Sequence, residues 1–239
     1  MKYITQEKKL VELVNTTNVF LKTSVIMEVL KKKADNTRYT NKMAKILIAC
    51  EESQEVCKAF RKLGHEAFSC DIEPCSGGYP EWHIQDDVLK HLEGWDLIIA
   101  HPPCTYLTNA AARHLFPGKI LNKERYEKGI LAKYFFIKLL NAPCDKVVVE
   151  NPIPSTIFKL PKYTQIIQPF EHGHPFSKKT CLWIKGLPNL EPSNVVEKVQ
   201  STKVAGNWFN RGGKERQKNR SKTFPGIAKA MAQQWGKLI

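Results

Sequence analysis

The sequence predicts an α/β fold, namely a doubly wound, mostly parallel, Rossmann-type sheet preceded by a helical N-terminal extension. Two observations predict the sheet. From Ala44 onward, short apolar runs alternate with amphipathic segments of helical length, which is typical of strands joined by crossover helices. The apolar runs are also continuous, with no polar residue at every second position, as expected for parallel strands that are buried on both faces.

The first half of the predicted sheet lies between residues 45 and 100. Lys45–Cys50 and Glu66–Asp71 are its first two strands, and Ser53–Leu63 is the helix between them. Gly64 follows this helix directly and is expected to end it as a C-cap. After a turn rich in proline and glycine, the apolar run Trp95–Ala100 predicts the next buried strand.

The second half begins with a long amphipathic helix over residues 122–141, and Lys146–Glu150 is the strand that follows it. Thr164–Phe170 and Thr180–Ile184 are rich in β-forming residues, so we expect antiparallel strands that finish the sheet. The last helix is Pro225–Trp235, which has its proline in the first turn, where a missing N–H is tolerated.

Positive charge is concentrated at the two ends of the chain. Residues 1–43 carry a net charge of +5 and contain apolar residues at helical spacing between residues 6 and 33. Residues 44–200 carry only +1, whereas residues 201–239 carry +8 and include a basic loop at 201–222. Basic flanks beside a near-neutral domain favour binding to a polyanion such as DNA. The N-terminal helices pack on the domain, contact nucleic acid, or form a homodimer or protein interface.

Cysteine usage and hydropathy exclude several classes of protein. The seven cysteines are odd in number and scattered, which fits neither a disulfide framework nor a metal site. Six of them are expected to be buried apolar side chains. The chain has no apolar run of about 18 residues and no signal-peptide pattern. We therefore expect a soluble, cytoplasmic protein with no membrane partner.

The seventh cysteine, Cys104, stands at the end of a predicted strand. The run to Ala100 is followed by His101-Pro102-Pro103-Cys104, and because proline cannot continue a sheet ladder, the thiol is expected on a loop. In open α/β sheets, ligands bind beyond the carboxyl ends of the strands. The turns at Glu51–Ser53, Asp71, Cys104 and Glu150 all lie at such ends, so one crevice is expected to gather them.

Cys104 and Glu150 together permit a particular chemistry. A thiolate adds to an electron-poor ring, and a neutral carboxylic acid can protonate a ring nitrogen as negative charge develops there. Glu150 ends an apolar strand and precedes Asn151-Pro152, so burial is expected to raise its pKa. His101 is expected to orient the loop.

Acidic residues at two further turns indicate how a cofactor is held. Asp71 lies about 20 residues beyond the first strand, where nucleotide-binding α/β folds place an acid that binds ribose hydroxyls. Asp86 or Asp87 could accept a hydrogen bond from an exocyclic amine such as that of adenine. The sequence contains neither GxGxxG nor GxxxxGK[ST], which favours a nucleoside cofactor without a pyrophosphate.

These motifs, taken in order, resemble those of the DNA cytosine 5-methyltransferases, and they look closest to the small phage-encoded branch of that family. The resemblance covers residues 44–239 and is most specific at Pro-Pro-Cys and Glu-Asn. Its motifs are Ile46 to Ser53, Lys62 to Phe68 leading to Asp71, Asp87, His101 to Cys104, Glu150 to Pro152, Arg216 to Arg220, and Phe224 to Ala228.

The resemblance implies a class I S-adenosylmethionine-dependent methyltransferase fold over residues 44–239. It also implies Cys104 as the nucleophile, Glu150 as the assisting acid, and Arg216 or Arg220 as the basic residue near the target base. The expected cofactor-binding residues are Cys50, Glu51, Ser53, Asp71, Ile72, Asp87, Val88, His101 and Pro102. The expected substrate-binding residues are Pro103, Thr105, Tyr106, Asn151, Arg216 and Arg220, with Arg220 also counted as catalytic.

Three departures from the family pattern keep other functions open. The turn after the first strand, Ala49 to Ser53, has no glycine; Thr105 follows the cysteine in place of glutamine; and Pro152 stands in place of valine. Only residues 188–222 stand where a target-recognition domain would be, so specificity is low or the substrate is single-stranded DNA, RNA, a nucleotide, or DNA presented by a partner. The alternatives to an enzyme acting on DNA are a catalytically silent nucleic-acid or protein binder, as in phage–host conflict, and a modifier of free pyrimidine nucleotides.

Overall fold

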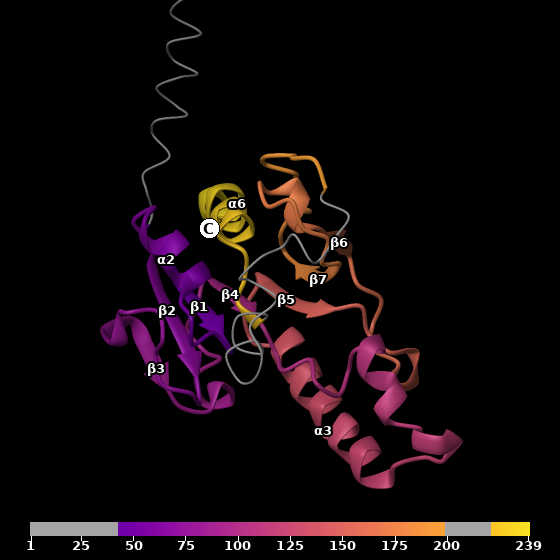
Figure 1. Cartoon of the computed structure of the whole chain (residues 1–239). Helices are drawn as coiled ribbons and strands as arrows, with labels where there is room; N and C mark the ends of the chain where they lie inside the picture. Colours follow the sequence, from indigo (N-terminus) through magenta and orange to yellow (C-terminus); the bar gives the residue numbers. More distant parts are fainter. Residues whose placement is uncertain (1–42, 199–220) are drawn as a thin grey trace, which may run out of the picture. The chain divides into compact units, whose positions relative to one another are not determined.

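A computed structural model describes residues 43–198 and 221–239 of the chain, and these residues form one seven-stranded sheet (Figure 1). The strands are β1 (Lys45–Ala49), β2 (Glu66–Asp71), β3 (His83–Gln85), β4 (Leu97–Ala100), β5 (Val147–Pro152), β6 (Gln165–Ile167) and β7 (Thr180–Lys185). Their order across the sheet is β3-β2-β1-β4-β5-β7-β6. The first five strands are parallel, and β7 is antiparallel to both β5 and β6.

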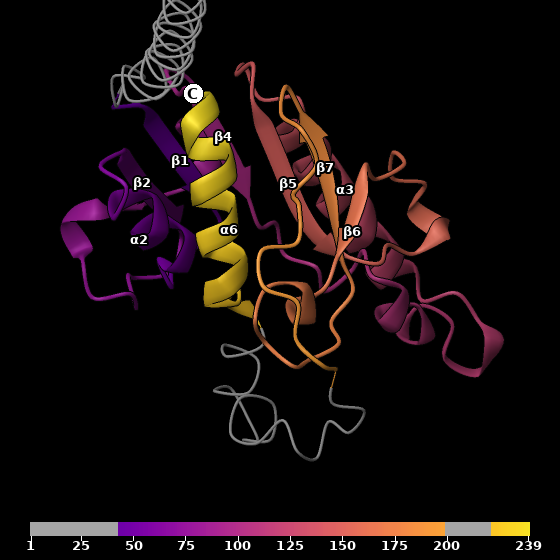
Figure 2. The ribbon, with the colours of Figure 1, turned by 90° about the horizontal axis from the view of Figure 1, so that it is seen from above.

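Helices cover both faces of the sheet, which confirms the predicted doubly wound fold. The α-helices are α2 (Glu55–Arg61), α3 (Lys123–Leu140) and α6 (Pro225–Trp235). In Figure 2, α6 and α2 lie in front of the sheet and α3 lies behind it. Short 3-10 helices make up the remaining helical turns: η1 (Pro80–Trp82), η2 (Val88–Lys90), η3 (Asn109–His114), η4 (Pro117–Lys119), η5 (Thr156–Phe158), η6 (Pro169–Glu171) and η7 (Gly236–Leu238).

The central strands are apolar along their whole length because each one supplies two cores. In β1, Ile46 and Ile48 pack into the core beneath α2 and α6, whereas Leu47 and Ala49 pack into the core beneath α3. All four side chains are fully buried. The continuous apolar runs in the sequence are therefore the signature of a sheet covered on both faces.

Several predicted boundaries shift in the structure for local reasons. The helix expected from Ser53 begins at Glu55, because Gln54 adopts a left-handed conformation with φ of 58°. The helix also ends earlier than expected, at Arg61, and its C-cap is Lys62 rather than Gly64. Gly64, with φ of 86°, instead forms the left-handed turn that leads into β2. The strand expected over Thr164–Phe170 is shortened to β6, since Pro169 begins a 3-10 helix. Strand β3, which has only three residues, was not predicted.

The burial of the cysteines confirms part of what the sequence suggested. Cys57, Cys70, Cys144 and Cys181 are buried, Cys50 and Cys75 are half-buried, and Cys104 is exposed. No helix in residues 43–198 and 221–239 is long and apolar enough to cross a membrane. The predicted N-terminal helices, the division of the chain near residue 43, and the basic loop lie outside the described residues, apart from positions 221 and 222 of that loop.

The docking of α6 depends on a close approach at Gly226. A Cβ atom at this position would lie 1.8 Å from the carbonyl oxygen of His172, while the amide of Gly226 donates a hydrogen bond to Nε2 of His174 at 2.9 Å. We predict that Gly226→Ala lowers the free energy of unfolding by about 2 kcal/mol, because backbone must move to admit the methyl group.

Chemical denaturation of the full chain measures this change. Lys229→Ala, at an exposed position of the same helix, is the control and should leave the unfolding midpoint close to that of the wild type. Equal midpoints for all three proteins would show that the approach at Gly226 is not tight.

Candidate active site

The parallel register brings the predicted site residues to one edge of the sheet. Ala49 pairs with Ala100 between β1 and β4, and Ala100 pairs with Val149 between β4 and β5. The next residue of each strand, which is Cys50, His101 or Glu150, therefore stands at the same level. Strand order reverses between β1 and β4, which is where open α/β sheets form their ligand crevice.

His101 and Glu150 form a buried pair at this edge. Nδ1 of His101 lies 2.9 Å from Oε2 of Glu150, and the two side chains are only 9% and 14% exposed. Burial by itself lowers the pKa of His101, but the carboxylates of Glu150 and Glu51 outweigh it and hold this pKa above its ordinary value. The two carboxylates therefore favour the protonated form of His101.

The expected rise in the pKa of Glu150 is wrong. Burial does favour the neutral acid, but the hydrogen bond and charge of His101, together with the charge of Lys178, hold the pKa of Glu150 below its ordinary value. Reasoning from the sequence accounted for the burial of a strand-end acid. The sequence did not show that His101, at the end of the neighbouring strand, contacts Glu150.

Two buried polar atoms next to this pair have no hydrogen-bond partner among the described residues. They are Nε2 of His101 and Oδ1 of Asn151. The other side of the Asn151 amide is engaged, since Nδ2 donates to the carbonyl oxygen of Pro102 at 3.1 Å. Buried polar groups are nearly always paired, so a donor and an acceptor left over at one edge indicate a ligand site.

Glu51 lies four residues before α2, and its side chain reaches the first turn of that helix. Its carboxylate is buried and accepts hydrogen bonds from the amides of Val56 and Cys57 at 2.8 and 3.2 Å. Burial raises the pKa of Glu51, although His101 and the two amides oppose this rise. In dinucleotide-binding folds, amides at this position bind phosphate. In this protein the Glu51 carboxylate already accepts hydrogen bonds from these amides, so they are not available to a pyrophosphate.

The glycine-free turn between β1 and α2 has the backbone of a glycine turn. Cys50 and Gln54 have φ of 60° and 58°, a left-handed conformation that costs a side-chain-bearing residue some strain. The side chain of Gln54 is fully buried, and it both donates to the carbonyl oxygen of Tyr79 and accepts from its amide, at 2.8 and 3.1 Å.

Gln54 is thus a residue that sequence reasoning missed, and it ties the first turn of the site to the loop after β2. A Cβ atom on Gly77 would lie 2.5 Å from Cβ of Gln54. The adjacent glycines Gly77-Gly78 were the available signal for this close contact. Ser53, beside Gln54, is buried as well.

The predicted ribose and adenine acids lie at the ends of β2 and β3, at the same edge. Asp71 is half-buried and accepts a hydrogen bond from the amide of Glu73 at 2.9 Å, and burial raises its pKa. Asp86 is engaged by Lys90 and His91 at 2.7 and 3.0 Å, which leaves Asp87 as the better candidate. Asp87 is exposed and caps η2.

Of the two apolar residues expected to contact the cofactor, Ile72 is 72% exposed and Val88 is buried. An exposed Ile72 directly after Asp71 offers an apolar surface at the carboxyl edge of the sheet. Val88 instead belongs to the core beneath α3, so any contact with a cofactor is through its backbone.

Cys104 is exposed on the loop beyond β4, as predicted. Asn151 holds the loop before it through Pro102, and the carbonyl oxygen of Cys104 accepts hydrogen bonds from the amides of Leu107 and Thr108 at 3.2 and 3.3 Å. The backbone on both sides of the thiol is therefore fixed. Pro103 and Thr105 beside it are exposed, as residues that bind a substrate must be.

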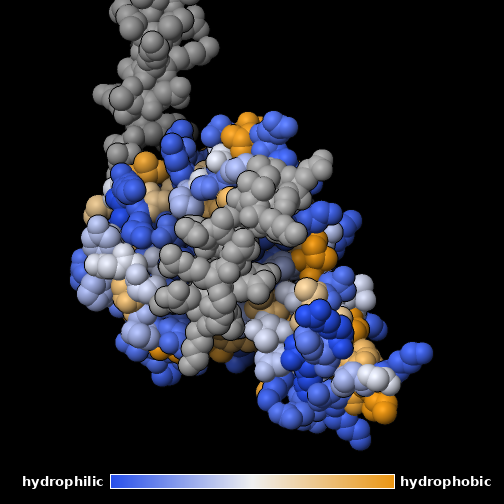
Figure 3. Space-filling model, in the orientation of Figure 1, coloured by the Kyte–Doolittle hydropathy of each residue, from blue (hydrophilic) through white to orange (hydrophobic). Residues whose placement is uncertain are grey.

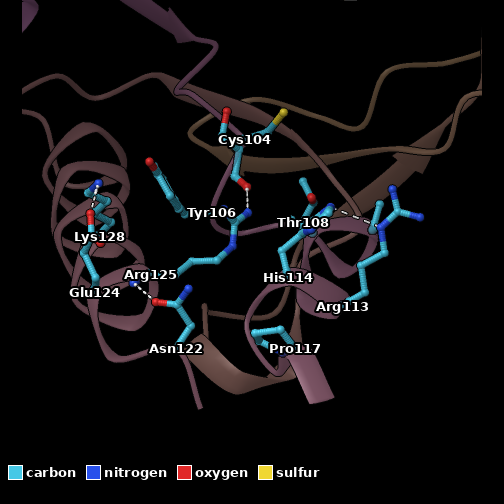
Figure 4. Close-up of a pocket in the computed structure, with 13 residues that line it drawn as sticks. Cys104, Tyr106, Thr108, Arg113, His114, Pro117, Asn122, Glu124, Arg125 and Lys128 are labelled. Carbon is cyan, nitrogen blue, oxygen red and sulfur yellow. Dashed lines mark hydrogen bonds and ion pairs between the residues drawn. The ribbon is translucent and has the colours of Figure 1, made fainter. Parts of the chain in front are cut away.

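A cavity of about 910 Å³ opens beside this loop (Figure 4), and its lining includes Cys104, Tyr106, Arg113, His114, Arg125 and Lys128. Arg125 donates to the carbonyl oxygen of Thr105 at 3.0 Å and lies 5.0 Å from the ring centre of Tyr106. Figure 4 shows the sulfur of Cys104 pointing away from Arg125. In this view the thiol therefore does not face the Arg125 side chain.

The structure therefore brings Cys50, Glu51, His101, Glu150 and Asn151 together at one edge, with Asp71 and Asp87 farther along it and Cys104 on the loop above β4. Arg216 and Arg220 lie outside the described residues. Among the described residues no cluster of histidine, cysteine and acidic side chains could hold a metal ion.

No protein-family model and no curated protein matches the chain. Solved structures with a similar fold include a proposed DNA modification methyltransferase encoded within an E. coli prophage, at 12% identity and a TM-score of 0.39, over 64% of this chain and 52% of that one. The Entamoeba histolytica methyltransferase EhMeth has 16% identity and a TM-score of 0.41, over 73% and 62% of the two chains. The S. pombe Dnmt2 methyltransferase has 13% identity and a TM-score of 0.38, over 61% and 51%. The chain thus spans between half and two thirds of each of these proteins.

The buried His101–Glu150 pair should make stability depend on pH. The raised pKa of His101 stabilises the fold fully below the unfolded value of about 6.5, and this contribution is lost as pH rises through the folded pKa. The lowered pKa of Glu150 stabilises the fold above about 4.3, and this contribution is lost as pH falls through the folded pKa. We predict that Glu150→Gln costs about 2 kcal/mol between these two pH values and less above them.

Denaturant unfolding of both proteins across this pH range measures the difference. Asp86→Asn removes an exposed carboxylate from another histidine, His91, and should show a much smaller and flatter difference. A constant difference between Glu150→Gln and wild type at every pH would contradict the ionised pair.

Proposed function

We propose that this protein transfers a methyl group from S-adenosylmethionine to carbon 5 of cytosine in DNA, through a covalent adduct on Cys104. The observation that carries the proposal is that an exposed thiol beyond β4 and a buried acid at the end of β5 lie at the same edge of the sheet. Cys104 is held by its loop at the carboxyl edge of the sheet, and Glu150 is held there by His101.

The chemistry of the carboxyl edge fits S-adenosylmethionine. Glu51, Asp71 and Glu150 supply carboxylates, and His101 is the cation paired with Glu150. A nucleoside that carries a sulfonium and an ammonium group suits such a surface better than a phosphorylated one. Asp71 would hold its ribose hydroxyls and Asp87 its adenine amine, while Glu51 faces its cationic part. When bound, it supplies an electrophilic methyl group.

The proposed reaction begins at the thiolate of Cys104 and passes through a covalent adduct. The Cys104 thiolate forms a bond to carbon 6 of the pyrimidine, and the displaced electron pair reaches ring nitrogen 3, where a proton is added. Carbon 5 would then be nucleophilic, and the bound cofactor would supply the methyl group. Loss of the proton from carbon 5 re-forms the ring double bond and expels the thiolate, while nitrogen 3 returns its proton.

His101 supplies the proton that Glu150 passes on. With a carboxylate at Glu150 and an imidazolium at His101, the pair holds one mobile proton on the line between Nδ1 and Oε2. As nitrogen 3 gains charge, this proton moves from His101 to Glu150 and on to nitrogen 3, which leaves a neutral imidazole and a carboxylate. Proton transfer by a positioned side chain contributes roughly 100- to 10,000-fold to a rate.

Incubation with DNA and isotopically labelled S-adenosylmethionine, followed by nucleoside mass spectrometry, tests the proposal. We expect 5-methylcytosine with the wild type and none with Cys104→Ala. An oligonucleotide containing 5-fluorocytosine should leave a covalent adduct with the wild type only, because the fluorine cannot depart as a proton does.

Cys144→Ala is the matched control, since Cys144 is a buried thiol just before β5, at the opposite edge of the sheet. It should keep both methyl transfer and adduct formation. Transfer to free cytidine nucleotides without DNA would favour the nucleotide-modifying alternative. No transfer to DNA, RNA or nucleotide would favour the catalytically silent binder.

The shared proton predicts a particular pH profile. The rate of methyl transfer should fall as pH rises through the pKa of His101, which lies above about 6.5. In His101→Gln, Glu150 must carry the proton itself, so the fall should move to lower pH and the rate at pH 8 should drop about 100-fold. Initial rates from pH 5 to pH 9 measure both profiles. A rate that drops equally at every pH would assign His101 a purely structural role.

A further inference from the structure

The loop after β4 and helix α3 form a lobe that extends from the sheet (Figure 1). We define the α3 lobe as residues 104–140, which contain Cys104, η3, η4 and α3. Because Cys104 is the first residue of the lobe, a ligand bound along the lobe lies next to the loop that carries the proposed nucleophile.

Charge within the central part of the chain is strongly separated. The α3 lobe holds seven Lys/Arg and two Asp/Glu, a net charge of +5. The other residues between 44 and 200 hold twelve Lys/Arg and sixteen Asp/Glu, a net charge of −4. The near-neutral total is therefore the sum of a basic lobe and an acidic remainder, and the lobe is a second polyanion-binding candidate in addition to the ends of the chain.

Part of this charge gathers around the cavity next to Cys104. Arg113, Arg125 and Lys128 line it with a single acid, Glu124, which pairs with Lys128. Arg125 is already oriented by Thr105 and Tyr106 (Figure 4). An excess of two positive charges in a cavity of about 910 Å³ fits phosphate groups.

The lobe also exposes an unusual share of large apolar side chains. It contains about a fifth of the described residues but half of their exposed large hydrophobics, namely Phe116, Ile120, Leu121, Tyr126, Leu131 and Tyr134, at 37 to 75% exposure. Figure 3 shows hydrophobic and hydrophilic side chains next to each other on this lobe. Phe116 directly precedes Pro117, which lines the cavity.

Cations interleaved with exposed aromatic rings are the features that bind single-stranded nucleic acid. A basic groove follows the phosphates, and the rings stack on unpaired bases without regard to sequence. A face made for an acidic protein partner would need the cations but not the rings next to them. The absence of a paired strand would also leave the target base accessible without the energy of extruding it from a duplex.

We propose that the α3 lobe binds a single-stranded segment of DNA, with its phosphates in the cavity of Arg113 and Lys128 and a base stacked on Phe116. The choice of DNA rests on the proposed function, whereas the location of the surface rests on the charge, the cavity and the exposed rings. The lobe would then bind the nucleic acid in place of a separate target-recognition domain.

Binding of fluorescent oligonucleotides to full-length Cys104→Ala, which binds without chemistry, tests the proposal across a range of salt concentrations. Arg113→Gln/Lys128→Gln in that background should weaken single-strand binding and reduce the slope of log affinity against log salt by about 1.4. Lys62→Gln/Lys229→Gln removes the same charge at exposed positions on and next to other helices and should change the slope far less.

A second pair of variants tests the stacking. Phe116→Ala should weaken single-strand binding about tenfold with little change in salt slope, whereas Leu63→Ala, which trims an exposed apolar side chain after α2, should not. The single strand should bind at least tenfold more tightly than the duplex of the same sequence.

Unchanged affinity and slope in Arg113→Gln/Lys128→Gln, an equal loss in its control, or duplex binding as tight as single-strand binding would each overturn the proposal. Tighter binding of RNA than of DNA would overturn the choice of DNA. Methyl transfer with normal binding by the lobe variants would refute only the lobe. Lobe-dependent binding without methyl transfer would refute only the proposed reaction.

Discussion

The hydrogen bond between His101 and Glu150 is the interaction on which the candidate site depends. It exists because β4 and β5 are adjacent, parallel and in a register that sets the residue after Ala100 beside the residue after Val149. A buried carboxylate alone would be costly, and a buried imidazole alone would lose its proton. Next to each other, each favours the charged form of the other. The pairing of two apolar strands therefore places a proton-bearing pair at the carboxyl edge of the sheet.

Around this pair, the carboxyl edge is divided by charge. The turns after β1, β2 and β3 contribute Glu51, Asp71 and Asp87, so that side is acidic and suits a cationic nucleoside. The chain beyond β4 is basic and suits a polyanion. Cys104 stands on the loop where the two sides meet, anchored through Pro102 to Asn151. Under the proposed function, the cationic methyl donor would bind on the acidic side and the nucleic acid on the basic side.

Much of this arrangement could be predicted from residue patterns because the relevant physics is local. Continuous apolar runs predicted the central strands, the prolines after His101 predicted a loop at Cys104, and parallel strands predicted a shared edge. Strand β3 and the buried Gln54 could not be predicted this way. Strand β3 has only three residues, two of them polar, so it gives no periodic signal. Gln54 is important only because the loop at Tyr79 lies close enough to form hydrogen bonds with it.

Residue patterns alone were enough to predict the α/β fold, the placement of Cys104, Glu150 and Asp71 at strand ends, and the basic character of the chain. Those features follow from periodicity, from proline chemistry and from charge, all of which are properties of short segments. The cation beside Glu150, which lowers the pKa of this carboxyl, and the position of a basic lobe within a near-neutral domain could be read only from the three-dimensional structure. Both depend on which side chains face each other across strands and helices far apart in the chain, and electrostatic energies are set by those distances and by burial.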